Sequence, residues 1–232
     1  MKNIRVEEIV NLDKKIDNII FKTTSYFSPN EKQALNNYDE KIIAYYQRIL
    51  ELIIKIAKEE NTKDIEKIDK KYFKVENTAS MMLESYMSVL EFQGNIDKRI
   101  TEKEIEVIKL IQENLKLDND FEMKNKIELA DCYFKIGDEN KARRLMLNTI
   151  KNNPDEDEPY QCMQNWYMYA KPDINKLADV IDLAEENNHI LITDFGYDRL
   201  VNYYKEIKDN NNYKKYQEIY ENWKNKRNTI SF

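Results

Sequence analysis

The sequence predicts an all-α protein built from stacked antiparallel helical hairpins, preceded by an N-terminal region of long helices. The 232 residues include only 3 glycines and 4 prolines, fewer than sheets joined by glycine-rich turns usually carry. Charged residues make up 34% of the chain with both signs interspersed, which is typical of solvated helix faces. Apolar side chains recur every three or four residues, the period of one face of an α-helix.

The N-terminal region, residues 1–76, is predicted to contain two long helices. An apolar stripe predicts the first from about Arg5 to Tyr26. A capping box with proline at the first helical position, Ser28–Glu31, predicts the start of the second, which extends to about Glu59. Its stretch 42–57 is apolar on more than one side, so it must be covered either by neighbours within the chain or by a second copy.

The following helices have weaker start signals. A charged segment over 62–72 predicts a short exposed helix, and Asn77–Thr78 is expected to cap the next. Thr101–Glu104 has the pattern of a second capping box and opens a helix that runs to Leu117. The expected domain boundary is soft and separates residues 1–76 from 77–232, and a single continuous domain remains an alternative.

The segment from Ile127 to Pro154 is predicted to form a hairpin of two short helices. Leu129, Ala130 and Tyr133 fall on one face of its first helix. Gly137 supplies the left-handed conformation that a helix C-cap favours, and Asp138 can cap the second helix.

This segment resembles the tetratricopeptide repeat (TPR), a helical hairpin with a recurring small-and-large apolar pattern. The matching positions are Leu129, Ala130, Tyr133, Gly137, Ala142 and Pro154. Lys126, Met146 and Thr149 depart from the family pattern. The resemblance implies a TPR-like α-solenoid, because one repeat cannot bury its apolar faces alone.

Neighbouring repeats are more degenerate. Pro172 follows Gly137 by 35 residues, close to the family period, but Gln164 and Asn165 stand where Leu129 and Ala130 stood. A third candidate aligns residues 203–205 with 133–135, and a fourth lies upstream over 82–117. The resemblance covers about residues 78–223 and is clear only in its middle.

In the TPR family, the first helix of each hairpin lines a concave groove that receives a peptide or another protein's helix. Carried onto this chain, that pattern places these residues in the groove: Ile127, Asp131, Phe134, Lys135, Cys162, Trp166, Tyr169, Tyr204 and Lys205. Aromatic rings there would provide stacking surface, and the lysines would anchor charge. The alternative is that these aromatics pack between hairpins or against the N-terminal helices.

Motifs for chemistry are sparse. His189 is the single histidine, and Cys132 and Cys162 lie 30 residues apart, which fits no zinc pattern. Neither a GxGxxG nor a phosphate-binding GxxxxGK(S/T) motif occurs. We therefore expect no catalytic residue, metal or cofactor, although the many carboxylates leave an unrecognised acid–base pair open.

Composition limits the partners. A net charge of −6 argues against nucleic acid, whose phosphates require a basic surface. Two cysteines fit a reducing compartment, and no apolar run approaches the length of a membrane span, so a cytoplasmic protein is expected. The leading hypothesis is a non-catalytic scaffold, such as an adaptor, an inhibitor or immunity protein, or a peptide sensor, which binds a peptide or protein in its groove. The rivals are a homo-oligomer assembled through residues 42–57 and, third, an enzyme with a carboxylate site.

Overall fold

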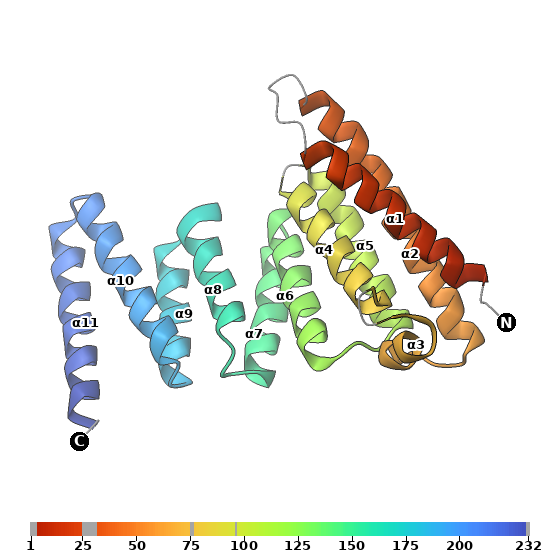
Figure 1. The fold of residues 1–232 in the computed structure, drawn as a ribbon. Helices are drawn as coiled ribbons and strands as arrows, with labels where there is room; N and C mark the ends of the chain where they lie inside the picture. Colours follow the sequence, from red (N-terminus) through yellow and green to blue (C-terminus); the bar gives the residue numbers. More distant parts are fainter. Residues whose placement is uncertain (1–3, 25–31, 75–76, 96, 231–232) are drawn as a thin grey trace. The chain divides into compact units, whose positions relative to one another are not determined.

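The computed structural model describes residues 4–24, 32–74, 77–95 and 97–230. In these ranges the ordered elements are eleven α-helices and one π-helical turn (Figure 1). Extended pairing is limited there to two isolated bridges, Asp64 with Lys116 and Lys74 with Asn77. The prediction of an all-α chain is therefore confirmed. The predicted capping box Ser28–Glu31 lies outside the described residues.

The chain divides into two compact units, Met1–Ile136 and Gly137–Phe232. Each unit is described by itself. The domain boundary predicted between residues 76 and 77 falls within the first unit. The helices α2 and α3, which precede this boundary in the chain, both pack against α4, which follows it. The assignment of two domains at that position stays a prediction.

The first unit contains six helices, and α2 is its central element. The bounds are α1 (Ile4–Thr24), α2 (Lys32–Glu59), α3 (Ile65–Tyr72), α4 (Ala79–Gly94), α5 (Lys98–Asn114) and α6 (Asn119–Lys135). α2 packs against α1, α3 and α4, and α5 packs against both α4 and α6. In Figure 1 this unit runs from red to green.

The apolar stretch of α2 is buried within the chain. Ile49, Leu50, Ile53 and Ile56 are each at most 1% exposed, so neighbours cover the helix on more than one face. Tyr46 adds a stacked contact with Tyr86 of α4 at 5.4 Å between ring centroids. Of the two coverings that the sequence leaves open for residues 42–57, the structure shows the one by neighbours within the chain, and the burial follows from the width of the apolar face.

The start of α5 differs from the prediction. Asp97 is the N-cap, with its carboxylate accepting from the Arg99 amide, so the helix begins one turn before Thr101. The Thr101 hydroxyl instead donates to the Gly94 carbonyl at 3.0 Å. The predicted capping box Thr101–Glu104 is wrong, because Thr101 and Glu104 lie within α5 and their side chains are buried.

The second unit is a succession of helices that pack on their chain neighbours. Its elements are α7 (Glu139–Asn152), α8 (Asp157–Asn165), the π-helical turn η2 (Trp166–Ala170), α9 (Ile174–Glu186), α10 (Ile190–Glu206) and α11 (Asn210–Ile230). α8 also touches α10, which brings η2 and α10 into reach of one another. In Figure 1 these elements run from green to blue.

Among the described residues, four helices end in the same way. Asn61, Gly137, Asn188 and Lys208 have φ of 49°, 96°, 57° and 59° and follow α2, α6, α9 and α10 respectively. A left-handed residue at this place lets the chain reverse after the helix C-cap. The prediction for Gly137 is confirmed, as is the cap by Asp138, whose side chain accepts from the Lys141 amide.

The turn η2 has a distinct hydrogen-bond pattern. The Lys171 amide donates to the Trp166 carbonyl at 2.8 Å, an i to i+5 bond in place of the usual i to i+4 bond. One extra residue is thereby accommodated in a single turn. The directions of the side chains from Trp166 to Ala170 consequently differ from those of a regular α-helix.

Candidate functional site

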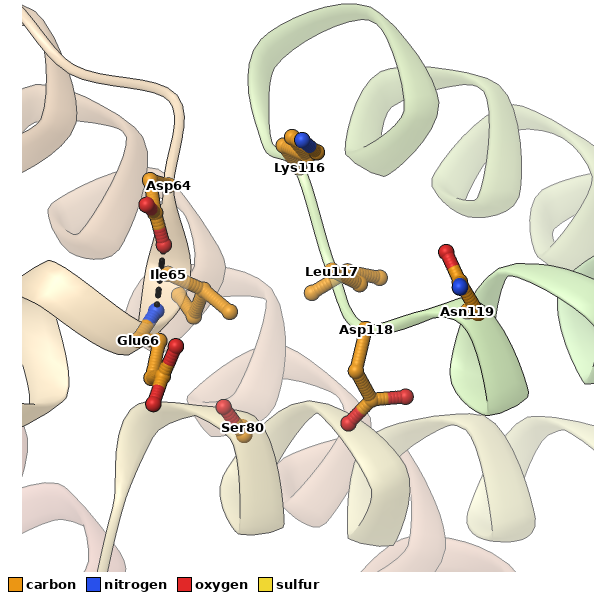
Figure 2. Close-up of a pocket in the computed structure, with 8 residues that line it drawn as sticks. All are labelled: Asp64, Ile65, Glu66, Ser80, Lys116, Leu117, Asp118 and Asn119. Atoms are coloured by element: carbon orange, nitrogen blue, oxygen red, sulfur yellow. Dashed lines mark hydrogen bonds between the residues drawn. The ribbon is translucent and has the colours of Figure 1, made fainter.

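A pocket of about 530 Å³ opens in the first unit between the start of α3, the start of α4 and the segment joining α5 to α6. Figure 2 shows Ile65 and Leu117 lying between the two facing segments, with polar residues around them. Asp64 accepts from the Glu66 amide at 3.1 Å and Asp118 from the Phe121 amide at 2.8 Å. These carboxylates cap helices α3 and α6, so their role in this pocket is structural.

A second feature of the first unit is a buried acidic cluster between α5 and α6. We define it as Glu104, Glu128, Asp131, Cys132 and Lys135. Glu128, Cys132 and Lys135 lie at i, i+4 and i+7 on α6 and so share one helix face. Because α5 packs against α6, Glu104 of α5 lies beside this face of α6.

The contacts in the buried acidic cluster leave one member unsatisfied. Lys135 Nζ lies 2.7 Å from Asp131 Oδ2 and 4.0 Å from Glu128 Oε1. Cys132 Sγ lies 4.0 Å from the same Glu128 oxygen. Glu104 is fully buried, and neither of its carboxylate oxygens has a hydrogen-bond partner.

Burial dominates the electrostatics of the cluster. It raises the pKa of Glu104, and burial together with the neighbouring Glu104 charge raises the pKa of Glu128. Burial also raises the pKa of the Cys132 thiol. Burial of the Lys135 ammonium disfavours its charge, but the Asp131 and Glu128 carboxylates overcome this and raise the pKa of Lys135.

The cluster can hold a proton or a cation. Ligand atoms of Glu104, Glu128 and Cys132 lie within 4.8 Å of one another. Sequence reasoning missed this group, because Glu104 was assigned to a capping box. A signal was present, since Glu104 lies four and seven residues before Ile108 and Ile111 and therefore on the apolar stripe of its helix.

The groove residues predicted in the first unit lie on α6. Ile127 and Phe134 are buried, whereas Asp131 and Lys135 form the ion pair described above. The prediction that these four residues line a groove stays a prediction. Two of them belong to the buried acidic cluster.

In the second unit, the predicted groove residues differ in their exposure to solvent. Trp166 is 3% exposed and Tyr169 is 66% exposed. Residues three positions apart normally share one face of an α-helix, so similar exposure would be expected for the two. The π-helical turn explains the difference, because the i to i+5 bond rotates Tyr169 away from Trp166. Cys162 and Tyr204 are half-buried. Tyr204 stacks on Tyr216 of α11 at 5.2 Å, and Lys205 is exposed.

Tyr169 instead adjoins α10, where it contributes to an exposed apolar surface. We call Tyr169, Leu191, Phe195 and Arg199 the aromatic–arginine surface. Leu191 is 70% exposed and Phe195 48% exposed, and with Arg199 they follow i, i+4, i+8 spacing along one face of α10. Sequence reasoning named only Tyr169, since the other three lie outside the TPR groove pattern.

Arg199 contacts two aromatic rings of this surface. Its guanidinium carbon lies 4.1 Å from the Phe195 ring centroid and 5.4 Å from the Tyr169 ring centroid. Cation–π contacts of this kind favour arginine over aromatic faces. The Nε and Nη1 atoms of Arg199 are covered and have no hydrogen-bond partner, and burial lowers the pKa of Arg199.

No match was found when the chain was compared with protein-family models, curated proteins and solved structures. Within the described ranges, no helix combines the length and the apolar character needed to cross a bilayer.

Proposed function

We propose that this chain is a non-catalytic scaffold that binds a peptide segment of a partner protein on the aromatic–arginine surface. The observation that carries the proposal is that Tyr169 and Phe195, both well exposed, lie against one arginine, with the exposed Leu191 one helical turn before Phe195. Tyrosine and arginine are enriched among the residues that dominate binding energy at protein interfaces. Large apolar side chains exposed together mark interaction surfaces more often than single ones do.

The chemistry of the surface defines the partner segment. Leu191 and Phe195 would contact an apolar side chain, and the Arg199 guanidinium would pair with a carboxylate beside it. Arg199 is only partly buried, so its guanidinium can also face a carboxylate of a bound segment. The expected ligand is therefore a short segment with leucine or an aromatic residue next to Asp or Glu.

The proposal retains the TPR-like α-solenoid in a modified form. Successive helices pack on one another within each unit, as stacked hairpins require. The proposed binding surface, however, includes only Tyr169 from the TPR-derived groove. A cytoplasmic location is part of the proposal and is supported by two cysteine thiols, Cys132 and Cys162.

The rival functions have less support. The homo-oligomer hypothesis depends on the apolar stretch 42–57, whose isoleucines and leucines are buried within the chain. The enzyme hypothesis would use the carboxylates of the buried acidic cluster, where Glu104 is fully buried and so out of a substrate's reach. Both remain hypotheses behind the scaffold.

The test is a selection from a random-peptide library displayed on phage, using the full chain as bait. Enriched peptides are expected to carry Asp or Glu beside Leu, Phe or Tyr. The best peptide is then synthesised with a fluorophore, and its Kd is measured by polarisation. Phe195→Ala and Arg199→Gln should each weaken binding by about tenfold or more, as expected for a residue worth at least about 1.4 kcal/mol.

The matched control is Phe92→Ala. Phe92 is an exposed phenylalanine of α4 in the first unit, so its loss should leave the Kd unchanged within about twofold. Circular dichroism must show equal helicity in all variants. An unchanged Kd in both Phe195→Ala and Arg199→Gln would refute the proposed surface, and so would a selection that enriches no common pattern.

A further inference from the structure

The buried carboxylate of Glu104 lies in the first unit, apart from the surface of the proposed peptide binding. Both oxygens are buried and lack hydrogen-bond partners, although burying an unpaired carboxylate is strongly unfavourable. Its neighbour Gly94 leaves room for it: a Cβ at Gly94 would lie 3.1 Å from Glu104 Oε2. The carboxylate is thus held at a defined place beside Gly94.

Two further ligand atoms lie where Glu104 points. Glu128 and Cys132, one turn apart on α6, each offer one atom, and the three atoms lie within 4.8 Å of one another. In helical bundles, metal sites are assembled in this way, from side chains on facing helices with ligands one turn apart. Ligands bound to one Zn²⁺ at about 2.0–2.3 Å would be closer together than this, so small rotamer shifts would close the site.

We propose that Glu104, Glu128 and Cys132 bind a divalent zinc ion between α5 and α6. The mixed donor set favours this metal, because a thiolate selects soft or borderline ions and Zn²⁺ also accepts carboxylate oxygen. Three protein ligands leave the fourth tetrahedral position to water.

Charge and access agree with a bound cation. The cluster combines three carboxylates, Glu104, Glu128 and Asp131, with the single ammonium of Lys135. Lys135 is held by Asp131 at 2.7 Å, so its charge is largely compensated before a metal enters. The side chains of Glu128 and Lys135 are 21% and 24% exposed, which provides an entry path beside the fully buried Glu104.

The test uses the full chain after dialysis against a chelator. Co²⁺ replaces Zn²⁺ as a spectroscopic probe, since a bound thiolate produces a thiolate-to-cobalt charge-transfer band. The wild type should show this band at one Co²⁺ per chain, and one equivalent of Zn²⁺ should abolish it. Elemental analysis after desalting should find one zinc per chain, and zinc should raise Tm because it binds the folded state.

Variants identify the ligands. Cys132→Ser should lose the charge-transfer band, whereas Cys162→Ser, the matched control in the second unit, should keep it. Glu104→Gln should weaken zinc binding by more than about 100-fold, since outer-shell partners alone are worth about 10–100-fold. Circular dichroism checks that each variant is folded, and the wild-type measurements decide the question even if Cys132→Ser does not fold.

Three results would overturn the proposal. The first is a wild-type protein that shows no band and retains no zinc. The second is a band that Cys162→Ser removes and Cys132→Ser keeps. The third is a Glu104→Gln variant that binds zinc as tightly as the wild type.

Discussion

Gly196 of α10 lies so close to Ile181 of α9 that a Cβ on Gly196 would stand 2.5 Å from Ile181 Cγ1. The same Cβ would lie 2.9 Å from Nε2 of Gln164, which donates to the Ile192 carbonyl at 3.2 Å. The absence of a side chain at residue 196 therefore lets α10 approach α8 and α9 together. This contact sets the position of the helix that carries the aromatic–arginine surface.

Gly196→Ala should lower the free energy of unfolding by about 1–3 kcal/mol, as forced overpacking of a core does. Intrinsic helix propensity alone would raise stability by about 1 kcal/mol, so the sign of the change separates the two effects. Urea unfolding followed by circular dichroism measures it. Adding Ile181→Ala should make Gly196→Ala less harmful than it is in the wild type, and a strictly additive double variant would contradict the contact.

Lys208→Gly should stabilise the second unit by roughly 1 kcal/mol. Lys208 has φ of 59°, a conformation that costs a residue with a Cβ about 1–2 kcal/mol. Glycine removes this cost, but it loses more backbone entropy on folding, which offsets part of the gain. The measurement is again urea unfolding. Lys205→Gly, in the last turn of α10, is the control and should destabilise, because glycine is less favourable than lysine in a helix. Equal effects of the two changes would show that φ at Lys208 is not the cause.

Glu139→Gln should reduce stability at pH 7 by about 0.2–1 kcal/mol, the range of exposed ion pairs. Glu139 Oε2 lies 2.6 Å from Lys171 Nζ, and its other oxygen contacts Lys176. These hydrogen bonds lower the pKa of Glu139. A lowered folded-state pKa contributes stability above the unfolded value of about 4.3, and this contribution is lost as pH falls through the folded-state value.

The difference in stability between wild type and Glu139→Gln should therefore shrink as the pH is lowered from 5 to about 3. High salt should shrink it as well, because the lysines are accessible to counterions. Thermal melts across this pH range provide the measurement. A difference that grows toward low pH would show that the carboxylate stabilises the protein in its neutral form.

Ile53→Ala should destabilise the protein by about 2–5 kcal/mol, since Ile53 is fully buried in α2. Because its neighbours are intrachain, the unfolding midpoint should not depend on protein concentration in either protein. Urea titrations at concentrations a hundredfold apart check this. A midpoint that rises with concentration would revive the oligomer hypothesis for residues 42–57.

The sequence was most informative where periodicity and turn chemistry agreed. The apolar stripe of residues 42–57 predicted a helix covered on more than one face, and Gly137 with Asp138 predicted a turn and its cap. Both depend on local rules that act within a few residues. The class of the fold followed from many such helices, whereas the TPR-specific arrangement is a matter of long-range packing.

The sequence was least informative where a local rule competed with burial. Thr101–Glu104 satisfies the capping-box pattern, but Asp97 caps the helix earlier, and Glu104 lies buried beside Gly94. The buried acidic cluster depends on the approach of α5 to α6, which no spacing along one helix specifies. Likewise, regular helical geometry predicts Trp166 and Tyr169 on one face, and the i to i+5 hydrogen bonding of η2 separates them.

The turn η2 makes the side-chain directions of the second unit sensitive to the length of the chain between α8 and α9. A π-helical turn holds one residue more than an α-helical turn over the same span. Deleting one residue within Trp166–Ala170 would restore the α-helical periodicity of the segment and present a different side chain beside Phe195. The close packing of α9 and α10 at Gly196 would be unchanged. The direction of the side chains at this place thus depends on chain length, which substitution alone does not change.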